Sequence, residues 1–394
     1  MAPTRSALTR DFFNCPPLTA AQVADYRMQG LQSIQDLVAK ADVANPAFGW
    51  SLVSDELNFK MYKGHVNGPS TLYCGRIEAV GSVEEVVELF RTDTTEQAQD
   101  FCRRTGRALI DFVNLYDIMA PTSAAPYDKI QIKWILGKSP LGGIVKKRDF
   151  CCLETTQELH IRGQRLWVRT YKSIELVCCP NFFARLGIIR GIANGCGHVF
   201  AESLHRPGYL SMTYVNDYQV NGSPPQWLVQ QTAQYRCRNV LDIDRFLREN
   251  RLSKTPFLPP QDWAPLGHWS ACLVCDKKFG PLRKKSNCTK CGHVVCTNCN
   301  RSWHVKIAGV WSKKLVCVGC SVRALKHAAT KSSVDQDLNL DTLCRHESTT
   351  YESEDVLSPD SDEYLEQSFS DTEAYASSHI AIQPLRLRSS SNRL

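Results

Sequence analysis

The spacing of apolar residues along the chain predicts a helix first and strands after it. Residues 18–44 carry apolar side chains at helical spacing, at Val23, Leu31, Ile34 and Val38. Alternation follows at Leu57, Phe59 and Met61, and again over residues 72–77, which predicts two strands. Ser82 with Glu85 three residues later has the spacing of a capping box, so a helix is expected to begin there.

The middle of the chain predicts a large antiparallel sheet closed by a helix. Two helical segments are expected up to about Leu115. Pro224 and Pro225 then open a long helix to about Asn250, whose apolar stripe suits packing across a sheet. Strands rich in β-branched and aromatic residues are expected between them, over 130–136, 150–161, 165–176, 188–203 and 209–220. The stripe consists of Val229, Ala233, Cys237, Val240 and Leu247. This order predicts the α+β class, with a curved antiparallel sheet wrapped around a C-terminal helix.

Composition divides the 394 residues into four parts. The expected parts are an N-terminal helical segment (1–44), a globular domain (45–255), a small cysteine-rich domain with its proline-rich joint (256–325), and a tail (326–394). Between Glu347 and Glu373 the tail has ten acidic residues and no Lys or Arg, so disorder is expected there. Overall, 43% of the residues are hydrophobic and the formal net charge is +7, which is compatible with a sizeable core.

Eight cysteines within about fifty residues form four CxxC pairs and predict two zinc ions. Four thiolates hold one Zn²⁺ tetrahedrally, so eight ligands make two closed structural sites. The N-terminus lacks the apolar stretch of a signal peptide, and no run of 18 apolar residues occurs. We therefore expect reduced thiols in the cytosol and no disulfide framework. The expected ligands are Cys272, Cys275, Cys288, Cys291, Cys296, Cys299, Cys317 and Cys320.

The spacing of these cysteines, with Gly292 after the fourth, resembles that of FYVE zinc fingers. The resemblance implies that the first and third pairs hold one zinc and the second and fourth pairs hold the other. A RING finger is the alternative, because Cys291, His293 and Cys296 also fit a C-x-H-x2-C pattern. That register leaves Cys288 unused, whereas the FYVE register uses all eight cysteines.

FYVE fingers bind phosphatidylinositol 3-phosphate through three motifs, and this chain departs from each. The WxxD motif reads Trp263 to Leu266 without the Asp, the RRHHCR motif reads Lys284 to Thr289 without either His, and the RVC motif begins at Leu315 instead of Arg. Lysine is a point charge, whereas arginine grips a phosphate in two places. The resemblance therefore implies phosphoinositide binding with a degenerate motif and weak discrimination among anionic lipids.

The cysteine-rich domain is basic, with ten Lys and Arg residues against one acidic residue between Cys272 and Cys320. About five positive charges remain after two Zn²⁺ ions and eight thiolates are counted. Such a surface attracts anionic lipid, and it attracts nucleic acid without specificity. The residues expected at the lipid head group are Arg283, Lys284, Lys285, Lys313 and Lys314, and Leu282 is the residue expected to insert into the bilayer.

Residues 45–250 resemble START domains, whose helix-grip fold encloses an apolar lipid. The resemblance rests on the segments 147–150, 167–174 and 187–191, on the turn at Pro207 and Gly208, on the strand from Asp217 to Gly222, and on the helix start at 225–228. The tunnel wall itself is unknown from the sequence. Trp167, Tyr171, Met212 and Tyr214 are candidates that core packing would also explain. Asp149, Arg169 and Arg190 are expected to be surface or structural ions rather than buried partners of a ligand.

No catalytic residue is expected, because no nucleophile elbow, P-loop or dinucleotide fingerprint occurs. The predicted function is non-enzymatic lipid binding or sensing, with peripheral attachment to endosomal or other anionic internal membranes through the finger. The alternatives are a protein-interaction adaptor with an empty tunnel and a RING-like ubiquitin ligase. The acidic tail is further expected to compete with membranes for the basic finger.

Overall fold

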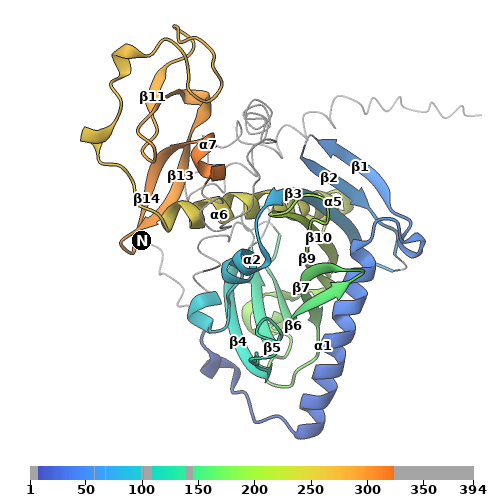
Figure 1. Ribbon diagram of the computed structural model, residues 1–394. Coiled ribbons are helices and arrows are strands. Elements are labelled where there is room, and N and C mark those ends of the chain that lie inside the picture. Colours follow the sequence, from blue (N-terminus) through green and yellow to red (C-terminus); the bar gives the residue numbers. More distant parts are fainter. Residues whose placement is uncertain are drawn as a thin grey trace, which may run out of the picture.

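The computed structural model describes residues 8–323 except 57, 67, 99–100, 102–108 and 139–144. In this part of the chain a large sheet domain is followed by a small finger (Figure 1). Leu57 and the whole acidic tail lie outside the described residues. The predictions of a disordered tail and of its competition with membranes therefore stay predictions.

Ten strands in the described residues form one sheet, in the order β1-β2-β3-β10-β9-β7-β6-β5-β4, with β8 paired to β6. Every pair along this order is antiparallel, and only the short β6–β8 pair is parallel. This confirms the predicted α+β class and antiparallel sheet. The strands are β1 (Ser51–Glu56), β2 (Phe59–Lys63), β3 (Thr71–Val80), β4 (Leu109–Met119), β5 (Lys129–Gly137), β6 (Arg148–Ile161), β7 (Gln164–Ser173), β8 (Ile189–Arg190), β9 (Ile192–Glu202) and β10 (Tyr209–Gln219).

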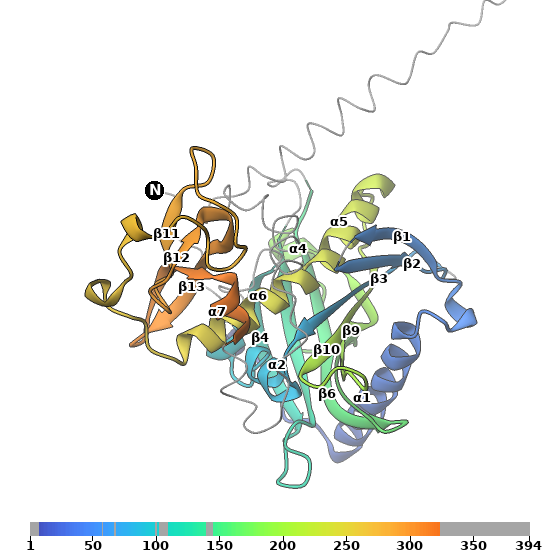
Figure 2. The same ribbon diagram turned by 45° about the horizontal axis from the view of Figure 1, so that its top comes forward.

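Helices cover both faces of the sheet (Figure 2). One face packs on α1, with Ile34 and Leu37 fully buried against strand residues such as Val168. The other face packs on α5, α6 and α2, in a cluster that includes Phe200, Cys237 and Leu247. The helices are α1 (Ala20–Ala41), α2 (Val83–Leu89), α4 (Phe183–Leu186), α5 (Gln226–Arg238) and α6 (Val240–Ser253), with short 3-10 turns η1 (Arg10–Phe13) and η2 (Pro46–Phe48).

Two helix starts follow the sequence closely. Thr19 caps α1 and Ser82 caps α2, each in a reciprocal capping box with the residue three positions later. The expected boundary at residue 44 lies just after α1, yet α1 packs along β6, β7 and β9. A Cβ added at Gly30 would lie 2.7 Å from Thr155 Oγ1, which shows how closely helix and sheet approach. The helical segment and the sheet therefore share one core.

Two expectations about secondary structure are wrong. Residues 109–115 belong to β4 rather than to a helix, and three irregularities in its pairing with β5 disturb the alternation that marks a strand. The long final helix is two helices, because the Asn239 N–H turns back to Arg236 O at 3.2 Å and α6 starts afresh. The apolar stripe continues across this break, so periodicity did not reveal it. Gly75 of β3 allows the close approach of α5, since a Cβ there would lie 2.6 Å from Cys237 O.

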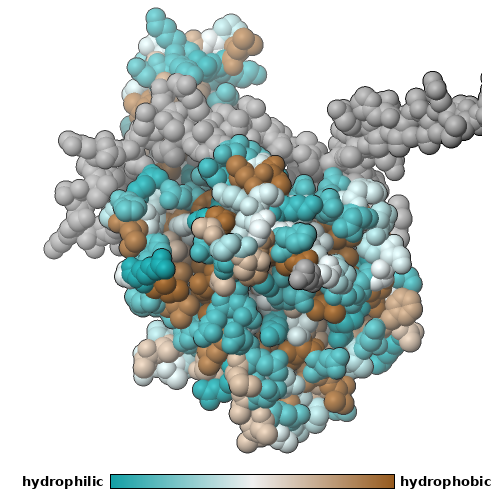
Figure 3. Space-filling view, turned by 90° about the vertical axis from the view of Figure 1, so that its right-hand side faces the viewer, coloured by the Kyte–Doolittle hydropathy of each residue, from teal (hydrophilic) through white to brown (hydrophobic). Residues whose placement is uncertain are grey.

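The exposed side of the domain that carries β1 and α1 mixes hydrophobic and hydrophilic residues (Figure 3). Leu52 and Val53 of the edge strand β1 and Met28 of α1 are exposed there. The pairing of β1 with β2 shifts register between Leu52 and Ser54, which places an irregularity on this edge strand. Irregular edges discourage further strand pairing. Among the described residues, no helix is both long and apolar enough to cross a bilayer.

Candidate zinc and lipid sites

The finger consists of two small hairpins and short turns. The first hairpin pairs β11 with β12, and the second pairs β13 with β14. The elements are η3 (Pro260–Asp262), η4 (Leu266–His268), β11 (Lys285–Asn287), β12 (Val294–Cys296), η5 (Thr297–Cys299), β13 (Asn300–Ile307), β14 (Val310–Cys317) and α7 (Val318–Arg323). Half of the buried residues in its core cluster are cysteines. The interior of the finger is therefore formed largely by the side chains that are expected to bind metal.

The structure gathers the eight thiols into two tetrads, with all sulfur atoms of a tetrad within 4.8 Å of one another. One tetrad contains Cys272, Cys275, Cys296 and Cys299, and the other contains Cys288, Cys291, Cys317 and Cys320. The pairing is crossed, first with third and second with fourth. His293 is exposed and belongs to neither tetrad of the described residues, so the arrangement is not the RING register.

Backbone amides in both tetrads point at sulfur in the same pattern. The N–H groups of Val274 and Cys296 donate to Cys272 Sγ at 3.4 and 3.2 Å. The N–H groups of Lys290 and Cys317 donate to Cys288 Sγ at 3.4 and 3.2 Å. Such donors stabilise negatively charged sulfur, the form that binds zinc. Four thiolate donors per site fit Zn²⁺ and leave no open coordination position for catalysis.

The comparisons with known proteins agree with this geometry. Residues 262–326 match the family model FYVE zinc finger. The mouse and human 1-phosphatidylinositol 3-phosphate 5-kinases are each 30% identical to this chain over 89 residues, which are 21% of this chain and 4% of theirs. The chain thus spans a small fraction of these curated relatives. The FYVE-type finger binds two zinc ions, as the sequence predicted.

Two solved structures are similar in part. Human StAR-related lipid transfer protein 5 is 15% identical, with a TM-score of 0.43, and the match covers 57% of this chain and 97% of that one. The LM5-1 FYVE domain from Leishmania major is 19% identical, with a TM-score of 0.16, over 19% of this chain and 89% of that one.

The residues at the degenerate phosphate-binding motif donate hydrogen bonds to the finger's own backbone. Lys285 Nζ donates to Leu266 O at 2.9 Å, and Asn287 Nδ2 donates to Ala264 O at 2.8 Å and to Gly292 O at 3.0 Å. Thr289 Oγ1 donates to Leu315 O at 2.9 Å. These contacts hold the segment after Trp263 and the start of the RVC-like segment in place, so they stabilise the finger.

The five cations expected at the head group do not form one cluster around a single pocket. Arg283, Lys284 and Lys285 line an open groove of about 550 Å³ together with Lys278, Trp269 and Phe279. Lys313 and Lys314 lie on β14, outside that groove, and adjacent strand residues point to opposite faces. Sequence reasoning missed Trp269 and Lys278, because their proximity depends on the backbone bonds that fold 270–279 back on itself, such as Phe279 N to Ser270 O at 2.9 Å.

Leu282 is fully exposed at the tip of a tight turn beside this groove. Gly280 and Arg283 close the turn, with the Arg283 N–H donating to Gly280 O at 2.9 Å. Phe279, in contrast, is partly buried against the finger core. The turn therefore presents the side chain of Leu282 to solvent.

The finger is fixed to the sheet domain through α6 (Figures 1 and 2). Glu249 Oε1 accepts from the His304 N–H at 2.9 Å, and Ser253 Oγ accepts from the Lys306 N–H at 2.9 Å, so α6 covers the free edge of β13. Lys290 Nζ donates to Leu252 O at 2.9 Å and Thr255 O at 2.6 Å, at the end of the helix. Leu252 itself is buried in the finger core. Helix α6 therefore packs both on the sheet and on the finger.

The four tunnel candidates share the face of the sheet that α5 and α6 cover. Trp167 and Met212 are buried in the cluster with Cys237 and Leu247, and Tyr214 packs against it. Tyr171 lies further along β7, two strand positions beyond Arg169, and is partly buried. The Nε1 atom of Trp167 and the Nδ1 atom of His198 are buried without a hydrogen-bond partner among the described residues. Buried polar atoms normally have a partner, so these two are candidates for contact with a ligand or water.

Three charged residues lie buried next to these aromatic residues. Glu154 pairs with Lys133 and with Arg169, whose Nε lies 2.5 Å from Glu154 Oε1, and all three are at most 1% exposed. Burial alone would raise the pKa of Glu154, but the charges of Arg169 and Lys133 outweigh it and hold the pKa well below its ordinary value. Burial lowers the pKa of Lys133 to about 8. The Arg169 guanidinium also lies 4.8 Å from the centre of the Phe90 ring.

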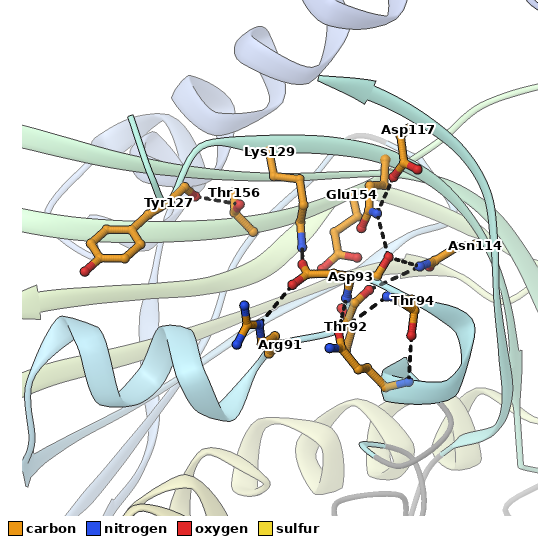
Figure 4. Close-up of polar contacts among 12 residues, drawn as sticks. Arg91, Thr92, Asp93, Thr94, Asn114, Asp117, Tyr127, Lys129, Glu154 and Thr156 are labelled. Carbon is orange, nitrogen blue, oxygen red and sulfur yellow. Dashed lines mark hydrogen bonds and ion pairs between the residues drawn. The ribbon is translucent and has the colours of Figure 1, made fainter. Parts of the chain in front are cut away.

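The segment that follows α2 is held at this cluster by hydrogen bonds and an ion pair (Figure 4). Lys133 Nζ donates to Thr92 O and Oγ1 at 2.8 Å, and Lys129 forms an ion pair with Asp93 at 2.5 Å. Asn114 Nδ2 donates to Asp93 O at 2.6 Å. Asp149 and Arg169 were expected to be surface or structural ions. Both are buried, so they are not surface ions, and their ion pairs fit a structural role. Asp149 accepts bonds from Arg190 and from Trp134 Nε1.

Proposed function

We propose that this protein is a non-enzymatic lipid-binding protein whose sheet domain holds an apolar lipid and whose FYVE-type finger attaches it to anionic membranes. The observation that carries the proposal is the finger: two closed zinc sites support a basic surface with a fully exposed leucine at its tip. The family match supports lipid binding and membrane association of this segment. Phosphatidylinositol 3-phosphate is one head group that we propose for it, and endosomal membranes are the proposed location.

The sheet domain supports the second half of the proposal. Its face under α5 and α6 is lined by aromatic and aliphatic side chains, and pockets for apolar ligands combine such walls with a few polar groups. Trp167 Nε1 and His198 Nδ1, which have no hydrogen-bond partner among the described residues, are available to polar groups of such a ligand. Because α6 belongs to both the sheet domain and the finger, a membrane-bound finger would hold the sheet domain at a fixed distance from the bilayer.

Vesicle flotation of the full chain at increasing salt tests the membrane half. Binding to phosphatidylcholine vesicles that contain phosphatidylserine should be strong at low salt and should fall as salt rises, because exposed charges are screened over about 8 Å at physiological ionic strength. Pure phosphatidylcholine vesicles are the control. Tight, salt-resistant binding restricted to phosphatidylinositol 3-phosphate would show that the degenerate motif still reads the head group. Failure to float with any anionic vesicle would favour the adaptor.

A further inference from the structure

Two cysteines outside the zinc tetrads lie against each other in the sheet domain. The sulfur atoms of Cys15 and Cys178 are 3.3 Å apart, although the residues are 163 positions apart in the chain. Cys15 lies between η1 and α1, and Cys178 lies between β7 and α4. A disulfide bond is about 2.05 Å long, so a small movement of either side chain brings the two sulfur atoms to bonding distance. No spacing in the sequence indicates this pair.

The pair is more accessible than the other thiols around it. Cys15 and Cys178 are both partly exposed, whereas the other six cysteines that the structure describes in the sheet domain are buried. The neighbouring Cys179 and Cys151 are at most 1% exposed. Oxidation of cysteine depends on exposure, and buried thiols are inert. An oxidant in solution therefore reaches Cys15 and Cys178 before the other described thiols of this domain.

The two segments that carry the pair are held together by contacts that do not involve the sulfur atoms. The ring of Phe13 packs on that of Trp134, with ring centres 5.4 Å apart. The Tyr116 hydroxyl donates to Pro16 O at 2.6 Å and lies 3.6 Å from Cys178 Sγ. The fold thus keeps the two thiols at a high effective concentration, which favours a bond between them over a bond to another molecule.

We propose that Cys15 and Cys178 form a reversible redox site, which a hydroperoxide oxidises from two thiols to a disulfide bond. The bond joins the segment before α1 to the segment after β7. The reduced form agrees with the thiols expected in the cytosol, and the disulfide forms on exposure to peroxide. This inference does not depend on the proposed lipid binding.

The reaction balances with one hydroperoxide. The Cys178 thiolate attacks the peroxide, so that an S–O bond forms, the O–O bond breaks and an alcohol leaves. The Cys15 sulfur then attacks the sulfenic sulfur, the S–S bond forms and water leaves. The two sulfur atoms lose two electrons, which reduce the peroxide. Cys178 attacks first, because burial and the neighbouring Cys178 raise the pKa of Cys15 to about 11, so Cys15 keeps its proton at neutral pH.

Peptide mapping of the full chain after treatment with hydrogen peroxide tests the site. The free thiols are alkylated and the protein is digested without reduction. We expect a cross-linked peptide that contains Cys15 and Cys178 and that disappears after treatment with dithiothreitol. The melting temperature of the sheet domain should rise by at least about 5 °C, because a disulfide that closes a long loop restrains the unfolded chain. Zinc content, measured in parallel, reports any oxidation of the finger.

Three variants serve as controls. Cys15→Ser and Cys178→Ser should lose both the cross-link and the rise in melting temperature, and dimedone should trap a sulfenic acid on Cys178 in Cys15→Ser. Tyr116→Phe keeps both thiols and should keep the cross-link. Oxidation of finger cysteines without a bond between Cys15 and Cys178 would overturn the inference. So would a bond from Cys178 to a different cysteine in the unaltered protein, a result that peptide mapping gives even if a variant fails to fold.

Discussion

The sheet domain and the finger are stabilised by different physical means, although one helix serves both. The sheet domain buries large apolar clusters on both faces of the sheet, under α1 on one side and under α5 and α6 on the other. The finger has one small cluster, half of whose buried members are cysteines. The sheet domain thus relies on hydrophobic burial and tolerates a buried charge cluster, whereas we expect the finger to fold only when its thiolates hold metal.

Breaking one zinc site should have the largest effect and should separate the two regions. In Cys288→Ser the second tetrad loses a ligand, and zinc binding supplies about 10–16 kcal/mol in small zinc domains at neutral pH. We expect the variant to lose zinc from that site and to unfold the finger, while the sheet domain keeps its own cooperative transition. Metal analysis and calorimetry measure this. A folded finger that retains two zinc ions in Cys288→Ser would show that Cys288 is not a ligand.

The buried charge cluster should be the most sensitive polar feature of the sheet domain. Glu154→Gln leaves Lys133 and Arg169 buried without a negative partner, which costs about 3–5 kcal/mol. Glu158→Gln on the same strand is the matched control, because its ion pair with Arg165 is partly exposed and is expected to contribute under about 1 kcal/mol. Urea unfolding of both variants measures their free energies of unfolding. Equal losses of stability would mean that the buried cluster contributes no more than the partly exposed ion pair.

His198 should make the sheet domain sensitive to mild acid. Burial, with a smaller contribution from Arg169, lowers the pKa of His198 to about 3. The unfolded chain takes up this proton near its ordinary pKa of about 6.5, so stability is present above that pH and declines as pH falls. The loss should be about 2 kcal/mol at about pH 5.

The same titration with His198→Phe is the comparison. This variant keeps an aromatic ring beside Phe90 and Phe200 and should lose that part of the pH dependence. Urea unfolding at neutral and mildly acidic pH measures both proteins. Identical pH profiles would assign the acid sensitivity to other groups.

Weakening the contact between the two regions should have the smallest effect. Glu249→Gln removes the negative charge of the side chain that accepts the His304 N–H on the free edge of β13. The weaker hydrogen bond should lower the stability of this contact by about 1 kcal/mol. Hydrogen exchange at β13 should become faster, with little change at β5 or β6. Glu88→Gln, in an exposed ion pair with Lys254, is the control and should change neither. Faster exchange throughout the sheet would mean that the finger and the sheet domain unfold together.

Much more of the finger than of the sheet domain's interior could be predicted from the sequence. Cysteine spacing is local, so the two-zinc prediction needed no knowledge of the fold. The α+β class and the antiparallel sheet followed from alternation and turn residues, but the irregular pairing of β4 and the break at Asn239 hid two boundaries. The cluster of Lys133, Glu154 and Arg169 joins three strands, and the groove of Trp269 and Lys278 depends on turn geometry. Such long-range contacts leave no trace in a single sequence.

Native mass spectrometry of the full chain tests whether the finger holds two zinc ions and the sheet domain holds a lipid, because it reports metal and lipid in one spectrum. We expect a mass equal to the polypeptide with two zinc ions, and a further population that carries one apolar lipid after incubation with mixed phospholipid and sterol vesicles. Trp167→Phe and His198→Phe should lower the fraction with bound lipid without changing the zinc count. A chain that holds two zinc ions but acquires no lipid under these conditions would contradict the claim that the sheet domain is a lipid-binding domain.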